Sequence, residues 1–270
     1  DEIRLLMYQV VTALNYLHSC DIVHLDVKPS SVLVLNTSNT YGITDRGRQL
    51  TATLSSMGCA ESLQPPFPDL PSLQPTPSSI QLPNFGYNCC FWAPELAAMQ
   101  QYNRGEHVPA HWEWKKLDVW AIGTLFASVL RRGDPLFSGS DVRQLLEDIM
   151  LIRECRPRDT TVISEFPVHI KHVKQEEAKP LSTVLKQGIF SGANKDQELA
   201  AASDLLRQML AFEPEMRPTT VQILQHGFFN KVVDPRLHLD NGQRKFELTD
   251  SNILPWIETR VAERIAYWKK

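Results

Sequence analysis

The most informative stretch of this chain reads HLDVKPSS and runs from His24 to Ser31. Nineteen positions after its Asp26 stands Asp45, the first residue of the tripeptide Asp45-Arg46-Gly47. The aliphatic run at 32–35 and the stretch 41–44 favour two short strands between these positions. The pattern therefore predicts one acidic side chain in a loop and a second at the end of a short strand that follows it.

The composition is that of an ordinary globular protein. The 270 residues are enough for one large domain or two small ones, and 43% of them are hydrophobic and 22% charged. A net charge of −3 gives no reason to expect a nucleic-acid or anionic-membrane surface. No apolar run reaches the roughly 18–20 residues that span a bilayer. The five cysteines form no C-x-x-C pair, which indicates free thiols in a reducing compartment.

Apolar periodicity predicts a mainly α fold with a few short strands near its start. Residues 1–19 carry apolar side chains three and four positions apart, as in an amphipathic helix already under way, so we expect the chain to be cut at that point. Residues 115–131 are apolar almost all round, which predicts a helix buried on every side. Further helices are predicted at 140–154, 197–211, 219–229 and from about Pro255.

Two segments interrupt this pattern. Residues 61–85 are rich in proline and serine and predict a mobile loop. Residues 156–195 are polar and irregular, so we interpret them as an insertion. Residues 231–270 are interpreted as a C-terminal extension that contains the last helix. That helix could dock a partner, although an apolar helix face more often packs on its own core.

Five motifs in order resemble the C-terminal large lobe of a eukaryotic protein kinase over residues 1–230. The motifs are HLDVKPSSV (24–32), TDRG (44–47), WAPEL (92–96), LDVWAIG (117–123) and MLAFEPEMRPTTVQILQHGFF (209–229). The resemblance implies a mainly α (α+β) lobe with short strands around a catalytic loop and with segment 61–85 enlarging the activation segment. HLDVKPSSVLVLN and the stretch 140–155 are more narrowly similar to the cell-division-cycle-seven kinases, which fire replication origins.

The resemblance assigns roles in phosphoryl transfer from Mg-ATP. Asp26 corresponds to the base that accepts the proton of the substrate hydroxyl, and Lys28 to the Ser/Thr-kinase lysine that contacts the γ-phosphate. Asp45 corresponds to the magnesium ligand, and Gly47 keeps its turn permissive. Ser31 stands where an asparagine holds the second metal ion.

Three positions depart from the family pattern. Leu25 replaces the arginine that reads a phosphorylated activation loop. Arg46 replaces a buried phenylalanine, and burying its guanidinium unpaired would cost several kcal/mol. Ser31 offers a shorter and weaker metal ligand than asparagine. Residues that support the lobe are retained: the resemblance implies scaffold roles for His24, Asp118 (anchoring the loop backbone) and the pair Glu95 and Arg217.

Two hypotheses follow. The first is an enzyme, a Ser/Thr protein kinase that uses ATP and Mg²⁺; the second is a pseudokinase that holds partners. We expect the small lobe, with its glycine-rich loop and strand lysine, to be missing from these residues, which would leave the isolated chain with negligible activity. The expected partner is a protein substrate or a regulatory subunit, with no nucleic acid and no membrane. A location inside the cell, in the nucleus, is implied by the subfamily resemblance alone.

A zinc site is a weaker alternative. His107 and His111 are four residues apart and could join Cys89 and Cys90, but Pro109 argues against a helix between the histidines. Thr76, followed by proline, could be phosphorylated, although an unmodified spacer is the simpler interpretation.

Overall fold

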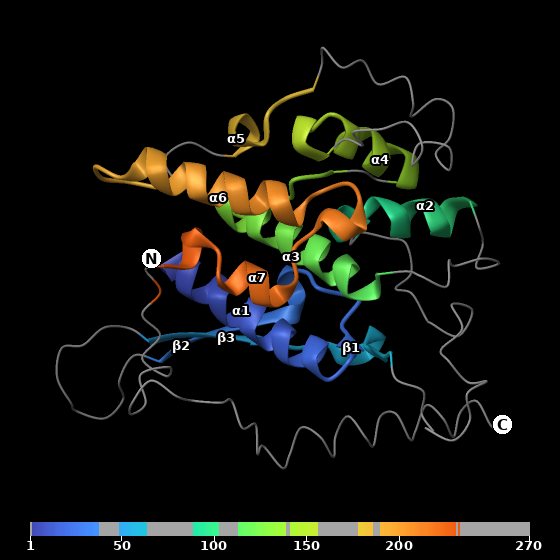
Figure 1. Ribbon diagram of the computed structural model, residues 1–270, viewed down its shortest axis with the longest axis horizontal. Coiled ribbons are helices and arrows are strands. Elements are labelled where there is room, and N and C mark those ends of the chain that lie inside the picture. Colours follow the sequence, from blue (N-terminus) through green and yellow to red (C-terminus); the bar gives the residue numbers. More distant parts are fainter. Residues whose placement is uncertain are drawn as a thin grey trace. The chain divides into compact units, whose positions relative to one another are not determined.

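The chain divides into two units, residues 1–232 and 233–270. The computed structural model describes residues 2–37, 49–63, 89–102, 113–138, 141–155, 178–185, 190–230 and 232, all in the first unit. Segments 41–48, 64–88 and 156–177, and the C-terminal extension with its expected helix, lie outside the described residues, as do Asp45, Arg46 and Gly47. The described part is rich in helix with a few short strands (Figure 1), which confirms the predicted fold class.

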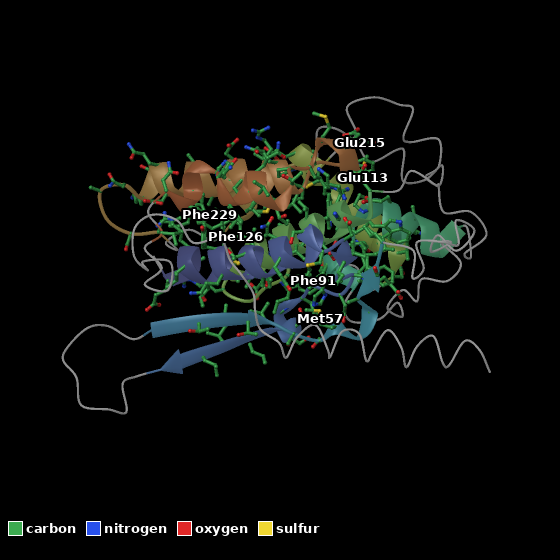
Figure 2. The ribbon with its side chains drawn as sticks, turned by 60° about the horizontal axis from the view of Figure 1, so that its bottom comes forward. Met57, Phe91, Glu113, Phe126, Glu215 and Phe229 are labelled. Atoms are coloured by element: carbon green, nitrogen blue, oxygen red, sulfur yellow. The ribbon has the colours of Figure 1, made fainter. Side chains whose placement is uncertain are left out.

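The centre of the lobe is helix α3, Trp114–Leu130. Nearly every residue from Leu117 to Leu130 is buried, on all sides of the helix, as its uninterrupted apolar sequence predicts. Helix α6 (Lys195–Met209) packs on one side of α3 and helix α1 (Glu2–Ser19) contacts it on another (Figure 1). Phe126 and Phe229, both labelled in Figure 2, are among the buried side chains of this core.

The other predicted helices form with different ends. Helix α4 spans Val142–Met150 and starts at Asp141, whose carboxylate accepts a hydrogen bond from the Gln144 amide. Helix α7 is only Thr220–Leu224, opened by a capping box between Thr219 and Gln222 and followed by a 3-10 turn at Gly227–Phe229. Both are shorter than the sequence predicts. Helix α2, Pro94–Tyr102, follows the WAPEL motif.

Both predicted irregular segments contain regular structure at their described ends. The segment 156–195 includes helix α5, Leu181–Val184, which packs on α6. The segment 61–85 begins with strand β4, Glu61–Ser62, which pairs with another strand. Leu181 and Leu185 are buried, so this part of the segment 156–195 belongs to the core. The interpretation of 61–85 and 156–195 as insertions stays a prediction.

The described residues contain four short strands in two antiparallel pairs. Strand β1 (Ile22–Val23) pairs with β4, and strand β2 (Val32–Thr37) pairs with β3 (Gln49–Leu54). Strand β3 packs against α1, where the Gln9 side-chain oxygen accepts a hydrogen bond from the Ala52 amide. Strand β3 was not among the predicted elements, and it brings a second loop beside residues 24–31.

Helix α3 lies in close contact with the end of α6 at Gly123. A Cβ atom at this position would lie 2.9 Å from Leu210 Cδ2 and 3.1 Å from Met209 Cβ. We expect Gly123→Ala to lower the free energy of unfolding by about 1–3 kcal/mol, because the methyl group overpacks this contact. Urea unfolding measures the loss. Gly227→Ala is the control, since the nearest atom to its Cβ would be 3.8 Å away; an equal loss in both variants would contradict the close approach.

Candidate active site

The buried carboxylate of Asp118, in α3, anchors the loop 24–31. Asp118 accepts hydrogen bonds from the backbone amides of His24 (2.8 Å, Oδ2) and Leu25 (2.8 Å, Oδ1) and from His18 Nε2 (2.9 Å, Oδ2). Its side chain is fully buried. A buried charge costs little only when its oxygens are satisfied, so these three donors fix the loop to the central helix.

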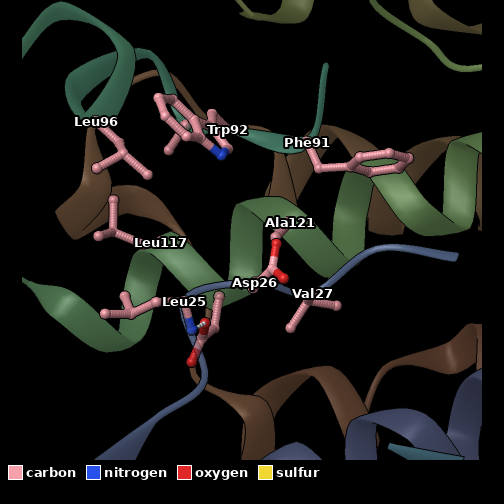
Figure 3. A pocket seen from close by; sticks show the side chains of 10 residues that line it. Leu25, Asp26, Val27, Phe91, Trp92, Leu96, Leu117 and Ala121 are labelled. Atoms are coloured by element: carbon pink, nitrogen blue, oxygen red, sulfur yellow. Dashed lines mark hydrogen bonds between the residues drawn. The ribbon is translucent and has the colours of Figure 1, made fainter. Parts of the chain in front are cut away.

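Leu25 has a conformation that few side chains adopt. Its φ is 62°, in the left-handed region, and its side chain is 5% exposed. It lines a small pocket with Trp92, Leu96 and Leu117 (Figure 3). Strain of this kind persists where the surroundings fix it, here through the hydrogen bond to Asp118 and the apolar packing. The residue that replaces the expected arginine is thus an apolar part of the core.

Asp26 and Lys28 form an ion pair at the surface of the loop. Lys28 Nζ donates to Asp26 Oδ2 at 2.6 Å, and the two side chains are 16% and 14% exposed. The Asp26 amide donates to His24 Nδ1 at 3.3 Å, so the backbone before the carboxylate is also fixed. The arrangement offers a carboxylate that can accept a proton and, beside it, an ammonium group that can contact an anionic oxygen.

Ser31 closes the loop. Its Oγ accepts a hydrogen bond from the Lys28 amide (3.0 Å) and donates to the Lys28 carbonyl (2.8 Å), and the residue is fully buried. The predicted role of Ser31 as a metal ligand stays a prediction. Because the residue is fully buried, its hydroxyl is not accessible to an ion in this conformation.

A second loop, residues 55–60, lies beside the first. It connects β3 to β4 and includes a 3-10 turn at Met57–Cys59. His24 Nε2 donates to the Ser55 carbonyl at 2.9 Å, while the Ser55 amide donates to the Ser31 carbonyl at 2.7 Å. Ser55 therefore contacts both ends of the loop 24–31.

A buried ion pair lies apart from these loops. Arg217 donates to both carboxylate oxygens of Glu95, at 2.6 Å and 2.8 Å, and its guanidinium side chain is fully buried. It also donates to the carbonyls of Ala211 and Phe212 and lies 4.9 Å from the ring of Trp120. The pair connects the start of α2 with the turn before α7, as the resemblance implies for Glu95 and Arg217.

The predicted site residues thus fall into three groups. His24, Asp26, Lys28, Ser31 and Asp118 are brought together around one loop, and Glu95 and Arg217 form a separate structural pair. Asp45 and Gly47 lie outside the described residues, so their roles stay predictions.

Sequence reasoning missed His18 and Ser55. His18 lies in α1, outside the motif 24–31, and only its hydrogen bond to Asp118 shows that it supports this loop. The signal for Ser55 was the alternation of Leu50, Ala52 and Leu54 just before it, which is typical of a half-buried strand.

The described cysteines do not resemble a metal centre. Burial raises the pKa of the Cys90 thiol to about 11, with the neighbouring Cys89 adding to the effect, and a metal ligand must be a thiolate. Among the described residues, His, Cys, Asp and Glu side chains form no group of three suited to an ion. His107 and His111 lie outside the described residues.

None of the helices in the described ranges combines the length and apolar character that a bilayer crossing requires.

An Asp–Lys loop anchored by the carboxylate of a buried helix, together with a separate buried Glu–Arg pair, defines the large lobe of a protein kinase. The family model of the protein kinase domain matches residues 1–229, and the chain belongs to this family. The family implies the use of ATP and Mg²⁺.

Two kinases illustrate the similarity. Mitogen-activated protein kinase hog1 of Trichoderma harzianum is 28% identical over 237 residues, which cover 86% of this chain and 53% of that protein. Probable cyclin-dependent kinase 8 of Dictyostelium discoideum is 26% identical over 269 residues, which cover 91% of this chain and 61% of that protein. The chain therefore spans little more than half the length of these relatives. Neither belongs by name to the cell-division-cycle-seven kinases, so that narrower resemblance stays a prediction.

Proposed function

We propose that this chain is the large lobe of a Ser/Thr-type protein kinase domain that transfers the γ-phosphate of ATP to a protein hydroxyl. The observation that carries the proposal is the Asp26–Lys28 pair on a loop fixed by Asp118. Asp26 accepts the proton of the attacking hydroxyl, and Lys28 stabilises the negative charge of the transferring phosphoryl group. Lysine two residues after the base is the feature that favours Ser and Thr over Tyr as the acceptor.

Replacement of Asp26 tests the proposal. In the longest natural polypeptide that contains this chain, we expect Asp26→Asn to lower phosphate transfer from labelled ATP to a basic protein substrate by about 10²-fold or more. Affinity for ATP should change little, because the carboxylate acts on the acceptor hydroxyl. Asp196→Asn, at an exposed position of α6, is the matched control. Equal transfer by wild type and Asp26→Asn, at a rate above that of a no-protein blank, would exclude Asp26 as the base.

A second candidate function is a pseudokinase that binds protein partners without catalysis. Two observations favour it: Leu25 is packed in the core, where it replaces a charged arginine, and the Ser31 hydroxyl is engaged by the loop backbone. This candidate predicts no transfer by the wild-type protein and equal partner binding by wild type and Asp26→Asn. The partner would be a protein substrate or a regulatory subunit. A nuclear location is proposed only because of the narrower resemblance to the cell-division-cycle-seven kinases.

A further inference from the structure

The four strands hold two loops in equivalent positions. Strand β1 leads into loop 24–31 and β2 leads out of it; β3 leads into loop 55–60 and β4 leads out. The incoming strand of one loop pairs with the outgoing strand of the other, through Val23↔Glu61 and Val32↔Leu54. The two loops are thereby placed next to each other at one end of both strand pairs.

Hydrogen bonds of Ser55 hold the two loops in this placement. It receives a hydrogen bond from the His24 ring and donates from its amide and its hydroxyl to the Ser31 carbonyl, at 2.7 Å and 3.1 Å. Consecutive Cα atoms are about 3.8 Å apart. Ser56, the next residue, therefore lies close to the point where the second loop contacts the loop 24–31.

The tripeptide Ser56-Met57-Gly58 matches the pattern of an Asp-x-Gly motif in which serine replaces the aspartate. Ser56 is exposed and left-handed, with φ 65° and ψ 49°. Met57, labelled in Figure 2, packs its side chain against the core, as the apolar middle residue of such a motif does. A Cβ at Gly58 would meet nothing within 4 Å. The sequence is thus polar, apolar, glycine, with a hydroxyl in the first position.

The alternative tripeptide, residues 45–47, precedes β3 in the sequence, whereas Ser56-Met57-Gly58 follows it. Asp45 lies in the stretch of sequence that joins Thr37 to Gln49, and these two residues pair at the end of the hairpin opposite to Val32↔Leu54. Five residue steps at about 3.4 Å separate the two ends, which gives ~17 Å. The strand that returns to the loop 24–31 is therefore β3, which ends at Leu54, two residues before Ser56.

We infer that Ser56-Met57-Gly58 holds the place of the magnesium-binding motif of the family, and that this lobe lacks the carboxylate with which the motif binds the ion. The metal binding implied by the family therefore does not fit the described residues. Ser56 and Ser31 are neutral hydroxyls, Asp26 is paired with Lys28, and Mg²⁺ selects anionic oxygen. The inference rests on strand pairing and holds whether or not the protein transfers phosphate.

Supplying the missing carboxylate tests the inference. Mn²⁺ is the probe, and the free ion is measured by electron paramagnetic resonance during titration of the 270-residue chain. We expect Ser56→Asp to bind Mn²⁺ about tenfold more tightly than wild type, because an added anionic ligand raises the affinity of a hard-cation site. The variant should fold, since aspartate tolerates the left-handed conformation that Ser56 already has.

Three further variants make the result decisive. Ser56→Asn tolerates the same backbone without the charge and should bind like wild type. Ser191→Asp adds a carboxylate at an exposed serine before α6 and should gain nothing at this site. Asp45→Asn should leave Mn²⁺ binding unchanged. The inference is overturned if Asp45→Asn abolishes binding that wild type shows, or if Ser56→Asp gains no more than Ser191→Asp in a chain with an unchanged thermal midpoint.

Discussion

Asp118→Asn is expected to lower the free energy of unfolding by about 3–5 kcal/mol. The fully buried carboxylate accepts three hydrogen bonds, from the His24 and Leu25 amides and from His18. An asparagine side chain keeps one acceptor oxygen and turns an NH₂ group toward donors. At least one buried N–H then has no acceptor, and the left-handed Leu25 loses the contact that fixes its backbone.

Urea denaturation followed by circular dichroism measures this loss, and hydrogen exchange locates it. The amides of His24 and Leu25 should exchange much faster in the variant, whereas amides in the middle of α6 should follow global stability. Asp196→Asn, at an exposed position, is the control and should change stability by less than about 0.5 kcal/mol. A loss in Asp118→Asn no larger than in this control would mean that the loop is not anchored to α3.

The second large effect is expected for Arg217→Ala, at about 3–5 kcal/mol. The guanidinium satisfies both oxygens of Glu95 and the carbonyls of Ala211 and Phe212, and it packs on Trp120. Removing it leaves a partly buried carboxylate and buried carbonyls without their donor and opens a space beside the indole ring.

Arg143→Ala is the matched control for this variant. Arg143 is 65% exposed and pairs with Glu147 one helical turn away, a contact worth about 0.3–0.5 kcal/mol. The same urea measurement on both variants compares a buried pair with an exposed one. Similar losses would show that the Glu95–Arg217 pair is not buried as described.

Much of the helical fold could be predicted from sequence, because its signals are local. The apolar stripe of α1 and the all-round apolar sequence of α3 each indicate a helix and its degree of burial. The ends of α4 and α7 were harder to predict, because the amphipathic pattern of each helix continues into the turn that follows it. Helix α5 is too short for its periodicity to stand out in a polar segment.

The strands show where local signals fail. The alternation of Leu50, Ala52 and Leu54 favours a strand at 49–54, but the tripeptide 45–47 favours a strand just before Asp45. Both patterns are physically reasonable, and only pairing with β2 shows which one returns to the loop. The scaffold residues Asp118, Glu95 and Arg217 were predictable from motif order, whereas the contacts of His18 and Ser55 depend on tertiary packing.

The most direct test of the two-loop arrangement is a methyl–methyl nuclear Overhauser measurement on the chain labelled at its Ile, Leu and Val methyl groups. The pairing of β2 with β3 predicts a strong cross-peak between the methyl groups of Val32 and Leu54, which are opposite each other in the register. A cross-peak from Val32 to Ile43 in its place would put the strand before Asp45 beside β2. That result would contradict the placement of Ser56-Met57-Gly58 after the strand that pairs with β2.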